Sequence, residues 1–358
     1  MAGRPATGPG SDRGEAALPM TGPQWVFTAL TLLLVLATLA PFSRNKKWWV
    51  RIWDFPRLQL AVLALVLICL ELAWLSLSHT ATFMLIAIAI ACLTWHLFRI
   101  APYTPLWRPD VPRSPGNAPD QRIRLLISNV EMTNRKSKGL LDIVERYNPD
   151  IVLTLETDQW WEEQLTPVAA SRPHGYHYAQ DNTYGMHLYS AVALEETNIR
   201  FLVESDVPSL QTTVVLPSGH RVQLHCLHPA PPSPTENEES TERDAELSIV
   251  ARRCAGNEAP IIVIGDLNDV AWSRTTRAFR KSSGLLDPRR GRGMYNSFHA
   301  RIPVMRWPLD HVFHSTHFSL IHLERLPSIG SDHFPIFVEL ELNGQYGTGV
   351  TGQPAPNA

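Results

Sequence analysis

Three long apolar stretches dominate the hydropathy pattern of the first hundred residues. They run over residues 25–42, 58–77 and 81–98, and Glu71 is the only acidic or basic residue inside them. Each is close to the ~20 residues that cross the hydrocarbon core of a bilayer as a helix. A cleaved signal peptide explains the first stretch poorly, because a Pro- and Gly-rich leader precedes it and two further stretches follow. We therefore expect three transmembrane helices, within a membrane region of residues 23–100.

The connection between the first two stretches is basic and rich in tryptophan. Asp54 is its only acid. Its basic residues and tryptophans are Arg44, Lys46, Lys47, Arg51, Arg57, Trp48, Trp49 and Trp53. Basic loops stay in the cytoplasm and tryptophans lie at the interface. This predicts a multi-pass protein of the cell (inner) membrane whose later part is cytoplasmic. Arg4 and Arg13 in the leader compete for the same side, so the inverted topology is the alternative.

Proline-rich segments separate the membrane region from the rest of the chain. Residues 101–121 hold six prolines, which fix φ and remove amide donors. We expect an extended linker that holds the following domain a short distance off the bilayer. The two ends, residues 1–22 and 343–358, are rich in Gly and Pro and are predicted to be a disordered leader and tail. Residues 122–342 remain as one domain.

Short apolar runs alternate with amphipathic stretches throughout this domain. Strands are predicted at 124–128, 150–155, 185–189, 199–203, 211–216, 221–228, 261–264, 310–313, 318–326 and 334–342, and helices at 139–147, 240–254 and 272–281. The turn Pro217-Ser218-Gly219 joins two strands as a hairpin. Because hairpins give antiparallel pairs, the sheets are expected to be mixed.

The segment 260–269 is the centre of this pattern. Its apolar run, residues 261–264, has the character of a strand covered on both faces. Gly265 allows a turn and a close approach of the backbone, and Asp266, Asn268 and Asp269 follow at the end of the strand. Open α/β sheets bind ligands at such edges, and oxygen ligands suit Mg²⁺. Taken alone, the segment is no more than an acidic turn.

Five further segments place polar groups beside predicted strands. They contribute Asn129, Glu156, His228, Asp310, Asp332 and His333. With this ordered set, the chain over roughly residues 122–342 resembles the endonuclease/exonuclease/phosphatase (DNase I-like) superfamily, in the form of a membrane-anchored bacterial-type member. The motifs are weak singly and specific in combination. The resemblance implies a four-layer α/β sandwich, in which two packed mixed β-sheets are flanked by helices, here preceded by three transmembrane helices.

The resemblance also implies a metal site. It assigns Glu156, Asp332 and Asn129 to a Mg²⁺ ion, with Mn²⁺ as the alternative. Asn268 and Asn129 would contact the phosphate of the substrate. The ordinary explanation for Glu156 is an acid at a strand end, which is less favoured because Asn129 and Asp266 accompany it.

The catalytic residues implied by the resemblance are His333, Asp310, Asp266 and His228. Asp266 would orient or deprotonate the attacking water, with contact to the metal as a second possibility. His333 would either transfer a proton or stabilise the pentacovalent phosphorus as an imidazolium, and Asp310 would fix its tautomer. His228 would donate to a phosphate oxygen. Asp269 is expected to form the turn instead.

The net charge of the predicted catalytic domain bears on the class of its substrate. Residues 122–342 hold 22 Lys and Arg against 28 Asp and Glu, a net charge of −6, which disfavours non-specific binding of duplex DNA. A lipid headgroup or another small phosphodiester near the bilayer fits better than nucleic acid. The basic residues 274–292 form either a solvated helix face or a contact for anionic lipid or nucleic acid. The tryptophans Trp160, Trp161, Trp272 and Trp307 line an access groove or, more commonly for this residue type, are simply buried.

The function expected from these patterns is hydrolysis of a phosphate ester by a membrane-anchored, Mg²⁺-dependent phosphodiesterase or nuclease. Metal-assisted in-line attack of water is the expected reaction. Its partners would be the lipid bilayer and the phosphate-ester substrate. The alternative is a non-catalytic membrane interaction protein that keeps the scaffold. The four cysteines show no spacing typical of disulfides or zinc, and a transporter is disfavoured because the apolar stretches offer no evident ion path.

Overall fold

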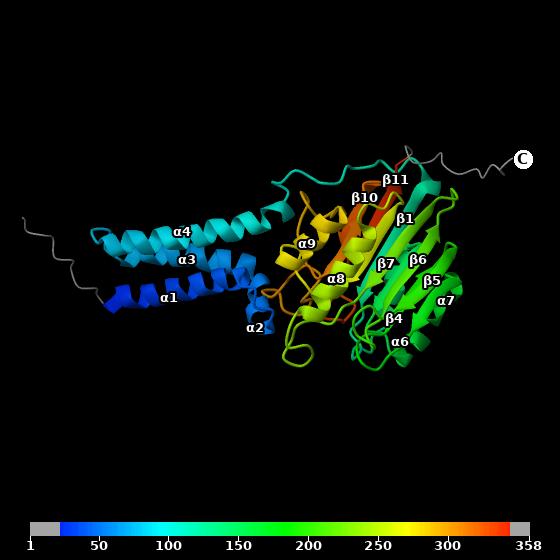
Figure 1. The fold of residues 1–358 in the computed structure, drawn as a ribbon, viewed down its shortest axis with the longest axis horizontal. Coiled ribbons are helices and arrows are strands. Elements are labelled where there is room, and N and C mark those ends of the chain that lie inside the picture. Colours follow the sequence, from blue (N-terminus) through cyan, green and yellow to red (C-terminus); the bar gives the residue numbers. More distant parts are fainter. Residues whose placement is uncertain (1–21, 344–358) are drawn as a thin grey trace, which may run out of the picture.

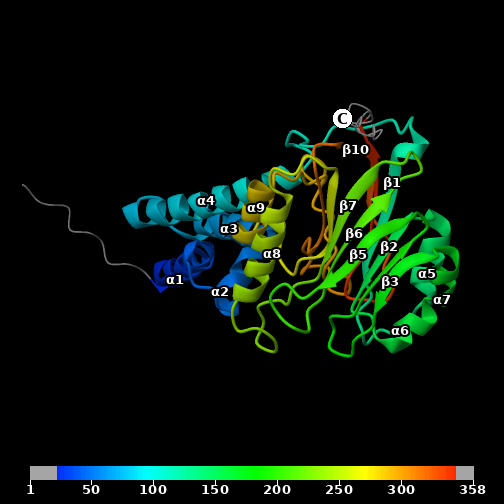
Figure 2. The ribbon, with the colours of Figure 1, turned by 45° about the vertical axis from the view of Figure 1, so that its right-hand side comes forward.

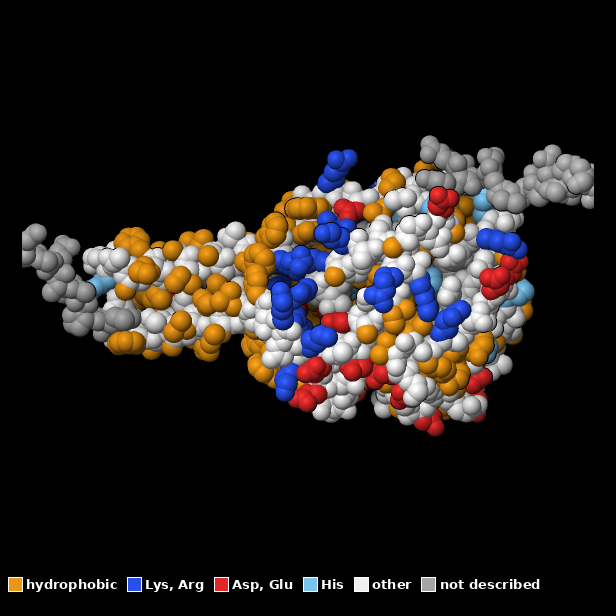
Figure 3. All heavy atoms as spheres, in the orientation of Figure 1, with side chains coloured by type: hydrophobic (Ala, Val, Ile, Leu, Met, Phe, Trp, Pro, Cys, Tyr) orange, Lys and Arg blue, Asp and Glu red, His pale blue; other side chains and the backbone are white. Residues whose placement is uncertain are grey.

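Three helices project as a rod from a globular α/β domain in the computed structural model, which describes residues 22–343 (Figure 1). The helices are α1 (Gly22–Leu39), α3 (Arg57–Trp74) and α4 (Thr80–Ile100). By length and composition they form three candidate membrane spans, each with no more than a third of its most apolar window buried inside the molecule. The remaining apolar surface, visible in Figure 3, is what a bilayer would cover. The predicted leader and tail lie outside the described residues, except for residues 22 and 343 at their inner ends.

Polar groups inside the rod contact one another. Glu71, the acid noted in the sequence, is fully buried and accepts a hydrogen bond from the Thr31 hydroxyl at 2.9 Å. Thr38 and Nε2 of His96 lie 2.9 Å apart between α1 and α4. Because a polar group in hydrocarbon must find a partner within the protein, these contacts hold the three helices in one arrangement.

A short segment connects α1 to α3 and lies against the globular domain. It contains η1 (Ala40–Phe42), α2 (Trp48–Arg51) and η2 (Ile52–Asp54). The Trp48 amide donates to the Glu238 carbonyl at 3.0 Å, and the Trp272 indole donates to the Asp54 carbonyl at 2.8 Å. The loop that the sequence places at the membrane interface is therefore also a contact surface of the domain.

Two β-sheets form the middle of the domain. The first has the order β10 (Phe318–Arg325), β11 (Ile336–Leu342), β1 (Arg122–Asn129), β2 (Ile151–Leu155), β4 (Met186–Ser190), β3 (His174–Tyr178). The second has the order β5 (Leu194–Arg200), β6 (Ser209–Val215), β7 (Arg221–Leu227), β8 (Ile261–Asp266), β9 (Asp310–His314). Only β1–β2 and β7–β8 pair in parallel, so both sheets are mixed, as expected.

Helices cover the outer face of each sheet (Figure 2). The first sheet carries α5 (Lys138–Tyr147), α6 (Gln159–Gln164) and α7 (Thr166–Ser171), and the second carries α8 (Thr241–Cys254) and α9 (Arg274–Ser283). Leu125 and Leu153 of one sheet pack with Leu224 and Ile262 of the other in a fully buried core. The four-layer sandwich predicted from the sequence is confirmed. The exposed edge strand β3 and the short helices α6 and α7 were not predicted.

The proline-rich segment is extended, as expected, but it packs along the domain. After η3 (Ala101–Tyr103), it pairs with the outer edge of the first sheet, where the Ser114 amide donates to the Leu320 carbonyl at 2.9 Å, and it ends in η4 (Pro119–Gln121). The Tyr103 hydroxyl donates to the Ala271 carbonyl at 2.7 Å. The domain therefore sits directly on the ends of the apolar helices, and the linker does not hold the two apart.

The parallel strand pairs bring their carboxyl ends to one edge of the sandwich. Gly265 is central to this arrangement, because its φ is 142° and a Cβ built there would lie 1.9 Å from the Leu227 carbonyl oxygen. Only glycine permits this approach. The next residue, Asp266, pairs with Asp310 across β8 and β9, which places two predicted catalytic carboxylates side by side.

Candidate active site

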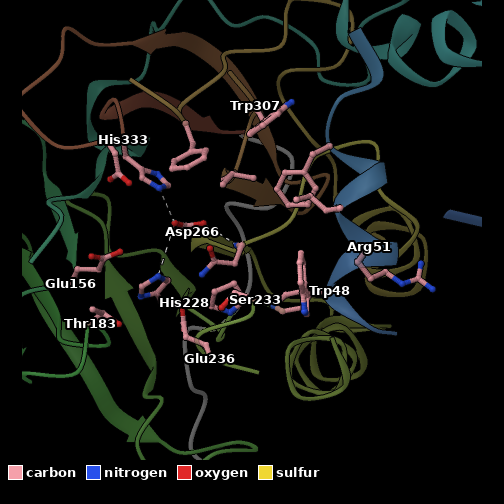
Figure 4. Close-up of a pocket in the computed structure, with 18 of the residues that line it drawn as sticks. Trp48, Arg51, Glu156, Thr183, His228, Ser233, Glu236, Asp266, Trp307 and His333 are labelled. Atoms are coloured by element: carbon pink, nitrogen blue, oxygen red, sulfur yellow. Dashed lines mark hydrogen bonds and ion pairs between the residues drawn. The ribbon is translucent and has the colours of Figure 1, made fainter. Parts of the chain in front are cut away.

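A cavity of about 480 Å³ opens at the carboxyl ends of the strands. Six of the predicted residues line it: Glu156, His228, Asp266, Asn268, Asp332 and His333. Figure 4 shows Glu156, His228, Asp266 and His333 gathered on one side of this pocket. Asn129 and Asp310 contact these residues from behind. The structure therefore brings all eight predicted site residues together.

His333 lies between two buried carboxylates. Its Nδ1 is 2.7 Å from Oδ2 of Asp310, and its Nε2 is 3.5 Å from Oδ2 of Asp266. Burial alone lowers the pKa of His333, but the two aspartates outweigh it and raise the pKa to about 10. The imidazole holds the pKa of Asp310 below its usual value against the opposing effect of burial. At neutral pH the pair is therefore an imidazolium and a carboxylate.

Asp266 lies at the centre of the cluster. Its Oδ1 accepts from the Asn268 amide at 2.9 Å, and its Oδ2 accepts from the Asn129 side chain at 3.3 Å. Burial raises its pKa to about 6, although His333 opposes the shift. A carboxylate with a pKa this close to neutrality has the basicity of a general base.

Glu156 follows β2 in a left-handed conformation, with a φ of 61°. Oε1 accepts from the Asn129 side chain at 2.8 Å, and Oε2 accepts from the Met132 amide at 3.3 Å. Burial raises the pKa of Glu156 to about 7, and the charge of Asp332 adds to the shift. Two carboxylates thus face one pocket close enough to repel each other, and a cation between them would relieve that repulsion.

These oxygen donors fit a divalent metal. Glu156 and Asp332 offer carboxylate oxygens, the hard ligands that Mg²⁺ prefers. Asn129 faces them with its side-chain N–H groups, which donate to Glu156 and Asp266, while its Oδ1 accepts from the Glu131 amide.

A second group, Asp266, Asp310 and His333, has ligand atoms that all lie within 4.8 Å of one another. Two atoms of that group, Oδ2 of Asp310 and Nδ1 of His333, share a hydrogen bond. Both groups therefore contain ligands for a metal, and in the second group His333 is already paired with a carboxylate.

His228 and Asn268 contribute neutral polar groups. Within residues 22–343, Nδ1 of His228 has no hydrogen-bond partner, and its Nε2 is 4.0 Å from Asp266. Burial lowers the pKa of His228 to about 4, so the ring is neutral at physiological pH. Asn268 adopts a φ of 50°, and one side-chain N–H donates to the Pro229 carbonyl. Its second N–H remains for a substrate oxygen.

Asp269 points away from the pocket. Its carboxylate accepts hydrogen bonds from the Val270 amide and from the hydroxyls of Ser273 and Thr276 at the start of α9. It also lies 3.7 Å from Arg243. This agrees with the turn-forming role expected for it.

The opposite side of the pocket comes from the membrane region. Trp48, Arg51, Ile52 and Phe55 of the connecting segment line it. Figure 4 shows Trp48 and Arg51 across the pocket from Glu156 and His333. Sequence reasoning recognised Trp48 as an interfacial residue and missed its place at the site. No local pattern indicates that contact, because it joins segments about 200 residues apart.

Aromatic groups from the domain complete the wall. Trp307 packs edge-on against Phe55 with ring centroids 5.6 Å apart, and Phe298 lies 5.0 Å from the His333 ring. Of the four tryptophans considered from the sequence, Trp307 alone lines this pocket. Trp272 is buried against the connecting segment. The pocket therefore has a charged floor, formed by Glu156, Asp266, Asp332 and His333, and an aromatic wall, formed by Trp48, Phe55, Phe298 and Trp307.

The two mixed sheets and the strand-end cluster define a hydrolase of phosphate esters. The family model described as "Endonuclease/Exonuclease/phosphatase family" matches residues 126–333, more than half of the chain. The chain belongs to this family, and it is a metal-dependent hydrolase acting on phosphate ester bonds. The predicted family and enzyme class are thereby confirmed.

Solved structures share the fold at low sequence identity. TDP2 of D. rerio complexed with single strand DNA product is 18% identical, covering 62% of this chain and 99% of that one with a TM-score of 0.51. The human Nocturnin catalytic domain with bound sulfate anion is 18% identical, covering 62% and 95% with a TM-score of 0.50. An endonuclease/exonuclease/phosphatase from Beutenbergia cavernae is 15% identical, covering 63% and 72% with a TM-score of 0.50. A comparison with curated proteins found no match.

Proposed function

We propose that the chain is a membrane-anchored, Mg²⁺-dependent phosphodiesterase that cleaves a phosphate ester presented at the membrane surface. One observation carries this proposal. The pocket that holds Glu156, Asp266 and His333 is walled on its other side by Trp48 and Phe55 from the segment between two apolar helices. A substrate in this pocket contacts the hydrolytic residues and the membrane region together.

The proton chemistry follows from the environments of the residues. Asp266, with its pKa near neutrality, accepts a proton from the attacking water, while Asn129 orients its carboxylate. His333 acts as an imidazolium that stabilises the negative charge developing on phosphorus-bound oxygens, and Asp310 holds its tautomer and charge. Neutral His228 donates a hydrogen bond to a non-bridging oxygen, and the free N–H of Asn268 positions another.

Glu156 and Asp332 would hold the metal, with Asn129 orienting Glu156 by a hydrogen bond. This all-oxygen set favours Mg²⁺, with Mn²⁺ as the closest substitute. When bound, the ion would neutralise charge on the phosphoryl oxygens. The raised pKa of Glu156 agrees with this role, since a carboxylate poorly compensated by the protein gains most from a cation.

A nucleic-acid substrate is the second candidate. It is favoured by the fold that this chain shares with TDP2 of D. rerio, whose structure holds a single strand DNA product. It is disfavoured by the net charge of −6 over residues 122–342, because binding to a polyphosphate backbone depends on Lys and Arg. The aromatic wall contributed by the membrane region also favours a substrate that lies at the bilayer.

The test compares substrates with the full-length protein in phospholipid vesicles. Labelled phospholipids, single-stranded DNA and abasic DNA are each supplied with Mg²⁺ or with EDTA. We expect Mg²⁺-dependent turnover of a phospholipid, and His333→Ala to lower it by roughly 10²- to 10⁴-fold, because it removes the imidazolium. His322→Ala is the matched control, since His322 is half exposed, contacts Glu324 and the Phe337 ring, and does not line the pocket.

Two results would contradict the proposal. Turnover that survives EDTA would exclude the metal role, and equal rates for wild type and His333→Ala would favour the non-catalytic alternative. Cleavage of DNA without cleavage of lipid would assign the nuclease function.

A further inference from the structure

A second cavity, of about 360 Å³, lies where the apolar helices meet α9. Arg57 and Arg99 reach it from the ends of α3 and α4, and Arg274 and Arg277 reach it from α9. Figure 3 shows Lys and Arg side chains gathered at this junction between the apolar rod and the globular domain. The cavity contains none of the residues that form the charged floor of the active-site pocket.

The charges around this cavity do not balance within the protein. Asp54 is the only acid that lines it, and its carboxylate lies 2.8 Å from Arg57 and 4.0 Å from Arg51. Arg57 is 1% exposed and Arg99 is 8% exposed. Within residues 22–343, Nε of each of these two arginines has no hydrogen-bond partner. The other nitrogens are partly engaged, because Arg57 pairs with Asp54 and Arg99 donates to the Trp272 carbonyl. Four guanidinium groups nevertheless face a single carboxylate in this cavity, so an anion bound there would offset their mutual repulsion and stabilise this junction.

The other lining residues are apolar and continue toward the helices. Phe42 and Trp95 have ring centroids 4.9 Å apart, and Phe98 lies 6.1 Å from Trp95. Phe42 and Phe98 are 55% and 61% exposed. Arg99 places its guanidinium 5.6 Å from the Trp95 ring centroid. The cavity thus combines an anion-binding end with an aromatic surface on the apolar rod.

We propose that this cavity binds the phosphate headgroup of an anionic phospholipid, whose acyl chains lie along Phe42, Trp95 and Phe98. Basic pockets at the ends of membrane helices recognise anionic headgroups, and the aromatic surface distinguishes a lipid from a free anion. The bound lipid bridges α9 to α3 and α4 and so holds the domain against the helix ends. This site is separate from hydrolysis and does not depend on the proposed substrate.

The basic stretch of residues 274–292 therefore has several roles. Arg274 and Arg277 face the cavity. Arg280 and Arg290 instead pair with Asp110 at 2.9 and 2.5 Å, and Arg289 is buried against Asp287 at 2.8 Å. Arg280, Arg289 and Arg290 thus form ion pairs within the protein, and the lipid contact considered from the sequence is proposed for Arg274 and Arg277 alone.

The experiment uses full-length protein in zwitterionic detergent micelles, titrated with phosphatidylglycerol and followed by native mass spectrometry. Wild type is expected to retain phosphatidylglycerol and not phosphatidylcholine. The double variant Arg274→Gln, Arg277→Gln should bind it roughly tenfold more weakly or worse, because two cationic contacts are lost. Arg252→Gln, Arg253→Gln is the control with the same charge change, since both residues are exposed on α8 away from the cavity.

Folding and activity are measured in parallel. Both double variants should unfold at the wild-type temperature in lipid-free micelles, because all four arginines are exposed. Added phosphatidylglycerol should raise the unfolding temperature of wild type and of the α8 control only, and it should do so equally in His333→Ala. Equal lipid retention by the α9 variant and its control would overturn the proposal. Saturation by inorganic phosphate at the same concentration as lipid would also overturn it, by assigning the cavity to a free anion.

Discussion

At the scale of single residues, the site depends on carboxylates held in unlike environments. Asp310 remains ionised because it pairs with His333, whereas burial raises the pKa of Asp266 to about 6 and that of Glu156 to about 7. One site therefore combines three carboxylates whose pKa values are set apart by their surroundings. Such separation of pKa values is typical of acid–base sites.

The charge of His333 makes the first prediction at this scale. The folded state raises its pKa from 6.5 to about 10. The resulting stabilisation is complete below pH 6.5 and is lost as the pH rises through about 10. Asp310→Asn removes a partner that raises this pKa, so the imidazolium should lose its proton at lower pH. We expect the basic limb of the kcat profile to move down by at least about one pH unit.

A pH–rate profile of purified protein in vesicles measures this shift. Asp142→Asn is the control, because Asp142 is exposed and pairs with Lys138 on the surface of α5. A lower kcat with an unmoved basic limb would show that Asp310 positions the ring without setting its charge.

At the scale of elements, the site is assembled by strands that approach closely at their carboxyl ends. The approach of β7 and β8 depends on Gly265, where a Cβ would collide with the Leu227 carbonyl. The positions of His228 and Asp266 depend on this approach, since His228 follows β7 and Asp266 ends β8.

We therefore predict that Gly265→Ala destabilises the domain by roughly 3 kcal/mol or more, because the backbone must shift and the φ is unfavourable. Gly219→Ala is the matched control. Gly219 also has a positive φ, of 82°, but no atom lies within 4 Å of the position that a Cβ would take there. Gly219→Ala should therefore lower the free energy of unfolding by only about 1 kcal/mol. Thermal or denaturant unfolding in micelles measures both. An equal loss of unfolding free energy in the two variants would show that the close approach of β7 and β8 does not contribute to stability.

The connecting segment carries the next prediction at this scale. Trp48→Ala removes an aromatic side chain from the pocket wall, so we expect kcat/KM for a membrane-borne ester to fall about tenfold. A short, water-soluble phosphodiester should be cleaved at an unchanged rate, because the charged floor remains.

Its neighbour supplies the control. Trp49 is 52% exposed and does not line the pocket, so Trp49→Ala should leave both rates unchanged. An equal loss on the soluble ester would indicate that Trp48 supports the floor of the site instead of contacting the lipid portion of the substrate.

At the scale of the whole molecule, the membrane region and the domain form one unit. Tyr103 and Trp272 connect the helix ends to the loop after β8 by hydrogen bonds at 2.7 and 2.8 Å. The pocket therefore lies at the same end of the three apolar helices as the basic connecting segment, whose residues line it. If that segment is cytoplasmic, as its charge predicts, the active site is cytoplasmic too.

Fusions at residue 342 test this topology. Green fluorescent protein attached there should fluoresce, and alkaline phosphatase attached there should be inactive, because it requires export to fold. The reverse pattern would place the domain outside, and equal signals would indicate mixed insertion.

Local residue patterns were enough to predict the helices, the strands and the reactive side chains of this protein. Apolar length predicted the three helices that are candidate membrane spans, and alternating short runs predicted the strands of the two sheets, because both signals are local in the sequence. Polar residues next to strands identified Glu156, Asp266 and His333. The first two follow the parallel strands β2 and β8, and His333 precedes β11, whose antiparallel pairing with β1 brings its amino end to the same edge. The catalytic roles of these residues stay predictions.

The surroundings of these side chains became known from the three-dimensional structure and not from the sequence. The placement of Trp48 and Phe55 in the catalytic pocket, and of Arg57 beside Arg277 in the second cavity, joins segments that are distant along the chain. The packing of the proline-rich segment on the domain is a further contact between segments that are distant along the chain. These contacts depend on how complete surfaces fit and bury charge, and such long-range complementarity leaves no period or motif in a single sequence.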